Sequence, residues 1–153
     1  MLNVGDSAPD FALPDQEDET VTLDDLVSGG PVVLYFYPAD FSPVCTAEAC
    51  AFRDRFDDVS ALGIRIAGIS RQSPESHGRF ARTFSLPFPL LSDSRGTAVE
   101  AYGVSGPFGF GVRRVTFLID ESKTIRNRVV SDLFVGSHMD LLKKTVASRR
   151  ASG

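Results

Sequence analysis

The two cysteines of the chain, Cys45 and Cys50, stand five residues apart in the stretch YFYPADFSPVCTAEACAFRD, and no other cysteine occurs. A thiol pair this close can be a redox pair, half of a metal site, or two small residues packed in a core. A zinc site needs about four ligands with short paired spacings. The only histidines, His77 and His138, stand alone in unrelated segments. The metal interpretation is therefore weak, whereas the redox pair and the packed pair both remain open.

Cys45 lies where a helix is expected to begin. Ser42 followed by Pro43 is a strong helix-start signal, because the hydroxyl can cap the first turn and proline fits the first helical position. Cys45 then falls in that first turn, where unpaired backbone N–H groups and the helix dipole favour an anion. A thiolate is an anion and is the nucleophilic form of cysteine. The pattern therefore favours a reactive Cys45 over an inert one.

Cys50 follows a turn and a half later on the same predicted helix. On a regular helix, the Cα atoms of residues five apart are separated by roughly 8–9 Å, whereas a disulfide needs about 7 Å or less. A bond between Cys45 and Cys50 therefore requires local unwinding, or a helix that ends before Cys50. The spacing argues against a static disulfide and for a transient one.

The elements that position these thiols alternate between strand and helix. The run PVVLYFY at 31–37 is apolar and is ended by Pro38, which is typical of a strand buried on both faces of a sheet. A helix is expected from Ser42 to Gly63, and residues 8–26 are expected to contain a hairpin. The other predicted elements are strands at 64–70, 88–92, 113–120 and 123–131, and helices at 73–86, 96–104 and 137–150, the last capped by Ser137.

This order predicts an α/β chain with a thioredoxin-like fold: a central mixed β-sheet flanked by helices, with an N-terminal β-hairpin. No linker or repeat divides the chain, so a single domain spanning residues 1–153 is expected. Folds of this kind place ligand sites at the carboxyl ends of their strands. The cysteine stretch lies at such an end.

Composition narrows the function classes. With 153 residues, 42% hydrophobic and 24% charged, the chain is typical of one globular domain. A net charge of −4 without any basic block longer than a pair disfavours nucleic-acid binding, and no apolar run approaches the ~20 residues of a membrane helix. No secretory signal is recognised at the start, so a cytoplasmic, reducing location is expected. There, a close cysteine pair is more often reactive or metal-binding than a permanent staple.

The stretch YPADFSPVC resembles the active-site signature of the peroxiredoxins: a proline, three residues, threonine or serine, two residues and the peroxidatic cysteine. The segments CTAEACAFRD, VGDSAPDFALPD, FPLLSD, AYGV and RVTFLID are similar to counterparts in the peroxiredoxin Q group, also called bacterioferritin comigratory protein. The resemblance implies a thiol peroxidase that reduces hydrogen peroxide and organic hydroperoxides without metal, haem or flavin. It also implies recycling by thioredoxin or a similar dithiol. We expect a monomer or weak dimer.

The resemblance gives a role to each matching residue. Cys45 attacks the peroxide oxygen and becomes a sulfenic acid, and Cys50 condenses with it to give an intramolecular disulfide. Ser42 stands where the family has a hydroxyl that hydrogen-bonds the peroxide, and Pro38 shields the sulfur from bulk water. Arg114 matches the arginine that holds the thiolate and polarises the peroxide, a task suited to a permanently charged group with several fixed donors.

The resemblance and the local pattern also give expectations for other residues near the signature. Glu48 matches a helix glutamate with a supporting role, and Arg113 is expected at the surface because neighbours on a strand face opposite ways. The segment SGPFGFGVR departs most from the family and predicts a mobile apolar lip, Phe108 and Phe110, beside the reactive thiol; a plain glycine-rich connector is the alternative. His77 is interpreted as helix surface or packing.

Two other function classes use the same cysteines. One is a non-enzymatic peroxide sensor, which needs the same activated Cys45. The other is a thiol–disulfide exchange protein, which normally carries C-x-x-C at the helix start, a motif that this chain lacks. Peroxide turnover separates the peroxidase from both.

Overall fold

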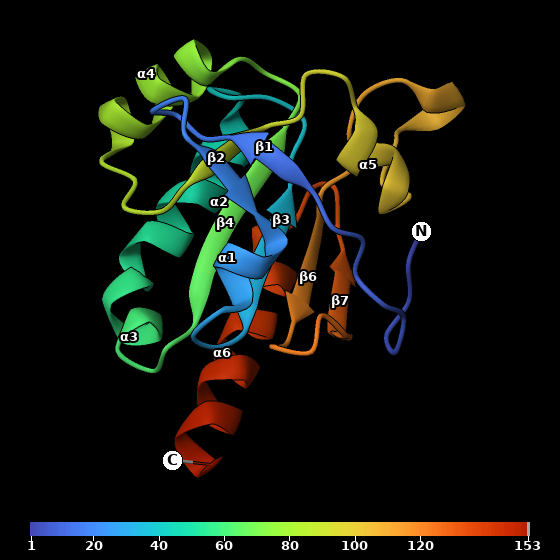
Figure 1. The fold of residues 1–153 in the computed structure, drawn as a ribbon. Coiled ribbons are helices and arrows are strands. Elements are labelled where there is room, and N and C mark those ends of the chain that lie inside the picture. The colour runs from blue at the N-terminus through green and yellow to red at the C-terminus, as the bar shows by residue number, and fades with distance from the viewer. Residues whose placement is uncertain (153) are drawn as a thin grey trace.

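The computed structural model describes residues 1–152, and they form a mixed sheet with helices on both faces (Figure 1). The strand order is β5-β4-β3-β6-β7. The two pairs β3·β4 and β4·β5 are parallel, whereas β3·β6 and β6·β7 are antiparallel. The strands span β3 (Val32–Phe36), β4 (Arg65–Ser70), β5 (Leu90–Ser92), β6 (Val115–Ile119) and β7 (Ile125–Val130). The predicted mixed sheet is confirmed.

The N-terminal hairpin is also confirmed, as a separate two-stranded antiparallel sheet of β1 (Ala12–Pro14) and β2 (Thr20–Thr22). Helix α1 (Leu23–Val27) follows it directly and was not predicted. The Thr22 side chain accepts from the Asp25 N–H while the Asp25 carboxylate accepts from the Thr22 N–H. This reciprocal capping box begins the helix.

The longer helices differ from the prediction at their ends. The helix expected over 42–63 breaks at Arg55, whose N–H bonds the Phe52 carbonyl three residues back; neither glycine nor proline marks this point in the sequence. The last helix begins at Val135, so Ser137 lies in its first turn and is not its cap. The helices are α2 (Pro43–Asp54), α3 (Phe56–Ser60), α4 (Pro74–Phe84), α5 (Thr97–Ala101) and α6 (Val135–Ser152), with a 3₁₀ turn, η1, at Pro107–Gly109.

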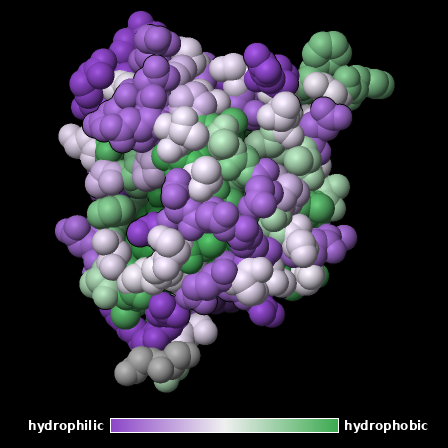
Figure 2. All heavy atoms as spheres, in the orientation of Figure 1, coloured by the Kyte–Doolittle hydropathy of each residue, from purple (hydrophilic) through white to green (hydrophobic). Residues whose placement is uncertain are grey.

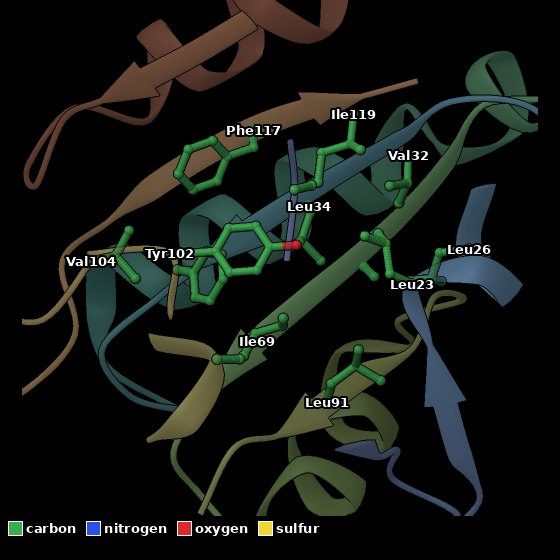
Figure 3. Packing of buried hydrophobic residues seen from close by; sticks show 14 of the residues in the cluster. Leu23, Leu26, Val32, Leu34, Ile69, Leu91, Tyr102, Val104, Phe117 and Ile119 are labelled. Carbon is green, nitrogen blue, oxygen red and sulfur yellow. The ribbon is translucent and has the colours of Figure 1, made fainter. Parts of the chain in front are cut away.

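Apolar side chains bury both faces of the sheet. Helices α1 and α5 and the hairpin cover one face, where Leu34, Tyr102 and Phe117 pack together (Figure 3). Helices α2, α3, α4 and α6 cover the other face, and Cys45 belongs to that cluster. All five residues of β3 are buried, as the sequence predicted for a central strand. Among residues 1–152, no helix has both the length and the apolar character that a membrane span requires.

Candidate active site

Cys45 occupies the first turn of α2, directly after the loop that leaves β3, and its side chain is buried. Ser42 is the N-cap residue, as predicted, and its carbonyl accepts from the Thr46 N–H at 2.9 Å. Its hydroxyl does not cap the helix, however; it donates to the Ala39 carbonyl at 3.1 Å. The first-turn N–H groups of α2 therefore have no side-chain cap, and the positive end of the helix dipole faces the thiol's turn uncompensated.

Arg114 places a positive charge beside the Cys45 thiol. Its side chain is only 3% exposed, and Nη2 donates to Cys45 Sγ at 3.0 Å. Nη1 donates to Glu48 Oε1 at 2.7 Å, and Nε donates to the Asp132 carbonyl at 3.2 Å. Three edges of the planar guanidinium are thus fixed by three different partners. Burial alone would lower the pKa of Arg114, but Glu48 and Cys45 outweigh it and raise that pKa.

Glu48 lies one turn after Cys45, on the same face of α2, and is fully buried. Only Oε1 is paired, by Arg114; Oε2 has no hydrogen-bond partner. Burial raises the pKa of Glu48 from 4.5 to about 7, against the opposing effect of Arg114. An ionised carboxylate with one unpaired oxygen is costly in a dry site, so the carboxyl takes up a proton near neutral pH.

His138 explains why Glu48 Oε2 is unpaired. The imidazole Nδ1 of His138, on α6, lies 3.7 Å from that oxygen. Nothing in the sequence predicts this approach of α6 to α2. Nε2 faces the Ser131 carbonyl at 3.0 Å, and Nδ1 faces the Thr116 hydroxyl at 2.6 Å. Burial lowers the pKa of His138. The neutral ring therefore donates from Nε2 and accepts at Nδ1, which leaves no proton for the carboxylate.

Arg113 and Asp132 hold the strand end that carries Arg114. Arg113 is partly exposed and pairs with Asp132 Oδ2 at 2.8 Å, while Asp132 Oδ1 accepts from the Arg114 N–H at 3.2 Å. The two arginines thus point to different surroundings, one to the surface and one to the thiol. Asp132 was missed in the sequence because it lies 18 residues away and belongs to no motif.

Pro38 and Phe110 line the same open hollow, whose volume is about 670 Å³ and whose lining does not include Cys45. Phe110 is 78% exposed, whereas Phe108 is 98% exposed and does not line the hollow. Both belong to the loop between α5 and β6, which projects from the body of the molecule in Figure 1 and forms a hydrophobic corner in Figure 2. The two phenylalanines thus share a loop but not an environment.

Cys50 is partly buried, and both cysteines are free. Helix α2 runs unbroken through both of them. On an intact helix their Cα atoms are roughly 8–9 Å apart, beyond the reach of a disulfide. In this conformation the two thiols cannot join.

Of the two interpretations of His77, helix surface is wrong and packing is confirmed, because the side chain is fully buried. Its Nδ1 lies 2.7 Å from Asp40 Oδ2. Asp40 belongs to the loop that carries Pro38 and Ser42, so a buried polar pair lies directly behind the site. Among residues 1–152, no group of three or more histidine, cysteine, aspartate or glutamate side chains is arranged to hold a metal ion.

Known proteins resemble this chain closely. The AhpC/TSA family matches residues 4–128. The putative peroxiredoxin bcp of Coxiella burnetii is 47% identical over 81% of this chain and 85% of its own length, and the peroxiredoxin Bcp of Escherichia coli is 40% identical over 92% and 93%. The crystal structure of peroxidoxin BcpB from Mycobacterium tuberculosis superposes with a TM-score of 0.89 at 38% identity, covering 99% of this chain and 98% of that one. This superposition confirms the predicted thioredoxin-like fold.

Proposed function

The chain belongs to the AhpC/TSA family and is a peroxiredoxin, as its signature predicted, and on this premise we propose that it is a thiol-dependent peroxidase in which Cys45 is the peroxidatic residue. Its substrates are hydrogen peroxide and organic hydroperoxides. The observation that carries the assignment is the 3.0 Å contact between Arg114 Nη2 and Cys45 Sγ inside a buried site. A permanently charged donor at that distance favours an anionic, nucleophilic sulfur.

The first step breaks the O–O bond of the peroxide. The Cys45 thiolate attacks one oxygen, which stays on sulfur as a sulfenic acid. The other oxygen leaves as water, or as an alcohol from an organic hydroperoxide, after it takes up a proton. The sulfur is oxidised by two electrons and the peroxide is reduced by two.

The surrounding residues orient the peroxide and stabilise charge. Ser42 offers its hydroxyl, which donates to the Ala39 carbonyl and keeps the lone pairs of its oxygen for a hydrogen bond from a bound peroxide. Arg114 polarises the O–O bond as charge develops on the leaving oxygen. Pro38 shields the site from water, and Glu48 keeps the guanidinium in place through its 2.7 Å ion pair.

The second step joins the two cysteines. The Cys50 thiol attacks the sulfur of the sulfenic acid, an S–S bond forms, and water leaves. Because α2 is continuous through both residues, the helix unwinds around Cys50 before this bond forms. Thioredoxin or a similar dithiol then reduces the disulfide by exchange and restores both thiols.

We also propose that the segment with Phe108 and Phe110 is the mobile lip of the peroxide entrance. Its support is the position of Phe110 in the hollow that Pro38 lines. Limited proteolysis of the reduced and oxidised forms tests it. Cleavage in this loop is expected to differ between the two forms, and equal cleavage rules the lip out.

Peroxide consumption with a dithiol reductant tests the assignment. The wild type, Cys45→Ser and Cys50→Ser are compared, with Ser60→Ala, an exposed change on α3, as the control. We expect Cys45→Ser to lose turnover, and Cys50→Ser to react once and then stall as a sulfenic acid visible by mass spectrometry. Turnover that survives in Cys45→Ser refutes the proposal. Oxidation of Cys45 without turnover indicates the sensor function instead.

A further inference from the structure

Asp40 is the one buried acid of the loop between β3 and α2, within the part of the chain that the structure describes. Its Oδ1 accepts from the Tyr37 hydroxyl at 2.6 Å, and its Oδ2 accepts from Ser76 Oγ at 2.8 Å. Oδ2 also faces His77 Nδ1 at 2.7 Å, and the backbone N–H of Asp40 donates to Gln72 Oε1. None of these groups has a part in the peroxide chemistry described above.

His77 faces an acceptor with each of its ring nitrogens. Nδ1 points at the Asp40 carboxylate, and Nε2 lies 3.1 Å from the Leu91 carbonyl. A proton on Nδ1 makes the first contact a hydrogen bond to the carboxylate. The two side chains therefore form a buried, hydrogen-bonded pair that joins the loop to α4 and β5.

A single peptide unit, the one between Ala39 and Asp40, connects Asp40 to the Ser42 hydroxyl of the active site. The N–H of that unit, on Asp40, donates to Gln72, and its carbonyl, on Ala39, accepts from the Ser42 hydroxyl. Rotation of Asp40 would turn this carbonyl and carry the hydroxyl with it. Phe41 follows with φ of 66°, a left-handed conformation that bulky residues rarely adopt. Such a conformation persists where its surroundings over-determine it.

The hydrogen bonds of Asp40 do not depend on the body of helix α2. Its partners are Tyr37, directly after β3, Gln72 in the loop after β4, and Ser76 and His77 on α4. Unwinding of α2 around Cys50 breaks none of these bonds. The loop that bears Pro38 and Ser42 thus has its own attachment to the rest of the fold.

We propose that the buried Asp40–His77 pair is a positioning device that fixes the Ser42 hydroxyl for the peroxide reaction and holds the loop in place while α2 unwinds. Only the second half of this proposal rests on the disulfide step of the proposed function. Asp40 and His77 touch no reacting atom; they act through the Ala39–Asp40 peptide.

Amide hydrogen exchange of the wild type tests the second half. The N–H of Tyr37, bonded to the Ile69 carbonyl at 3.0 Å, and the N–H of Asp40 report on the loop. We expect both to keep their protection in the Cys45–Cys50 disulfide form while amides of α2 lose theirs. Exchange at Asp40 that accelerates together with α2 overturns the fixed anchor. If peroxide produces no disulfide, the proposed function fails. The rates at which peroxide oxidises Cys45 in the Asp40 and His77 variants then test the positioning of Ser42 by itself.

Peroxide oxidation rates test the first half in Asp40→Asn and His77→Gln. Because misplacement of a reacting group by about 1 Å can cost on the order of 100-fold in rate, we expect oxidation of Cys45 to slow by about 10- to 100-fold. The control, Tyr102→Phe, removes a partly buried hydrogen bond to the Pro9 carbonyl (2.8 Å) on the other face of the sheet. Urea unfolding compares the stabilities of the three variants. If Asp40→Asn and His77→Gln both react as fast as a Tyr102→Phe protein of comparable stability, the positioning role is overturned.

Nitrogen-15 NMR of the wild type keeps the proposal testable if neither variant folds. We expect Nδ1 of His77 to show the chemical shift of a protonated nitrogen, and that shift to persist in the oxidised form. A ring with an unprotonated Nδ1 in the reduced protein overturns the Asp40–His77 hydrogen bond. Loss of the Nδ1 proton on oxidation overturns the anchor.

Discussion

Replacement of Glu48 by glutamine isolates the cost of burying its charge. Burial raises the pKa of Glu48 from 4.5 to about 7. Because a tenfold change in proton affinity corresponds to about 1.4 kcal/mol, the ionised carboxylate costs the folded state roughly 3 kcal/mol. Glutamine has nearly the same shape, keeps an oxygen for Arg114, and does not ionise. Its advantage over glutamate therefore depends on pH.

The sign follows from where the proton is held. Below pH 4.5 the carboxyl is protonated in the folded and the unfolded chain, and the cost is absent. Between pH 4.5 and about 7 the unfolded chain ionises while the folded chain keeps its proton, so the stability of the wild type falls as the pH rises. Above pH 7 the full cost applies. The stability of Glu48→Gln relative to its parent is thus expected to rise by roughly 3 kcal/mol between pH 4.5 and pH 8.

Urea unfolding of the reduced protein at several pH values measures this difference. Both proteins carry Cys45→Ser, so that ionisation of the thiol does not contribute. Any constant offset from the substitution cancels, because only the change with pH reports on the proton of Glu48. A difference that stays flat from pH 4.5 to pH 8, or one that grows in favour of glutamate, refutes the reasoning. It would mean that Arg114, and not burial, controls the charge of this carboxyl.

Three further changes test the site and its scaffold. Arg114→Lys is expected to slow peroxide oxidation of Cys45 by about 100-fold, since one ammonium cannot replace a fork fixed on sulfur and on Glu48 together; a stopped-flow rate near that of the wild type contradicts this. Phe52→Ala should lower the free energy of unfolding in urea by about 3–5 kcal/mol, because the ring is fully buried and stacks on Tyr35 at 4.7 Å; a loss under about 1 kcal/mol speaks against that packing. Tyr35→Phe should be neutral or stabilising by up to about 1 kcal/mol, because the buried hydroxyl has no hydrogen-bond partner; a clear loss of stability in the same assay shows a missed partner.

Local patterns in the sequence predicted the sheet and the placement of Cys45. The apolar run at 31–37 leaves β3 no solvent face, and Ser42 with Pro43 begins a helix at the end of that strand. Patterns of this kind act over a few residues, so they survive without tertiary information. The break at Arg55 does not belong to this class, because neither glycine nor proline marks it in the sequence.

Local patterns in the sequence do not predict which side chains surround the Cys45 thiol in the fold. The ion pair of Arg114 joins residues 66 apart, and the pair of Asp40 with His77 joins residues 37 apart. The Asp40 pair and the approach of His138 to Glu48 follow only from the way α4 and α6 pack on the sheet. A lone histidine in a helix gives no sign of the partner that it meets in the fold. Arg114 was predicted because a family signature records a contact that the sequence itself does not show.

The charge on Glu48 bears on the proposed unwinding of α2. Glu48 lies between the two cysteines on α2, and its Oε2 has no partner there. If α2 unwinds around Cys50, this carboxylate returns to water and its cost of roughly 3 kcal/mol disappears. That gain offsets much of the roughly 3–5 kcal/mol with which a buried ring such as Phe52 holds the helix closed. Since the gain exists only while the carboxylate is ionised, the proposed unwinding that would let Cys50 reach Cys45 is expected to be easier above pH 7 than at pH 5.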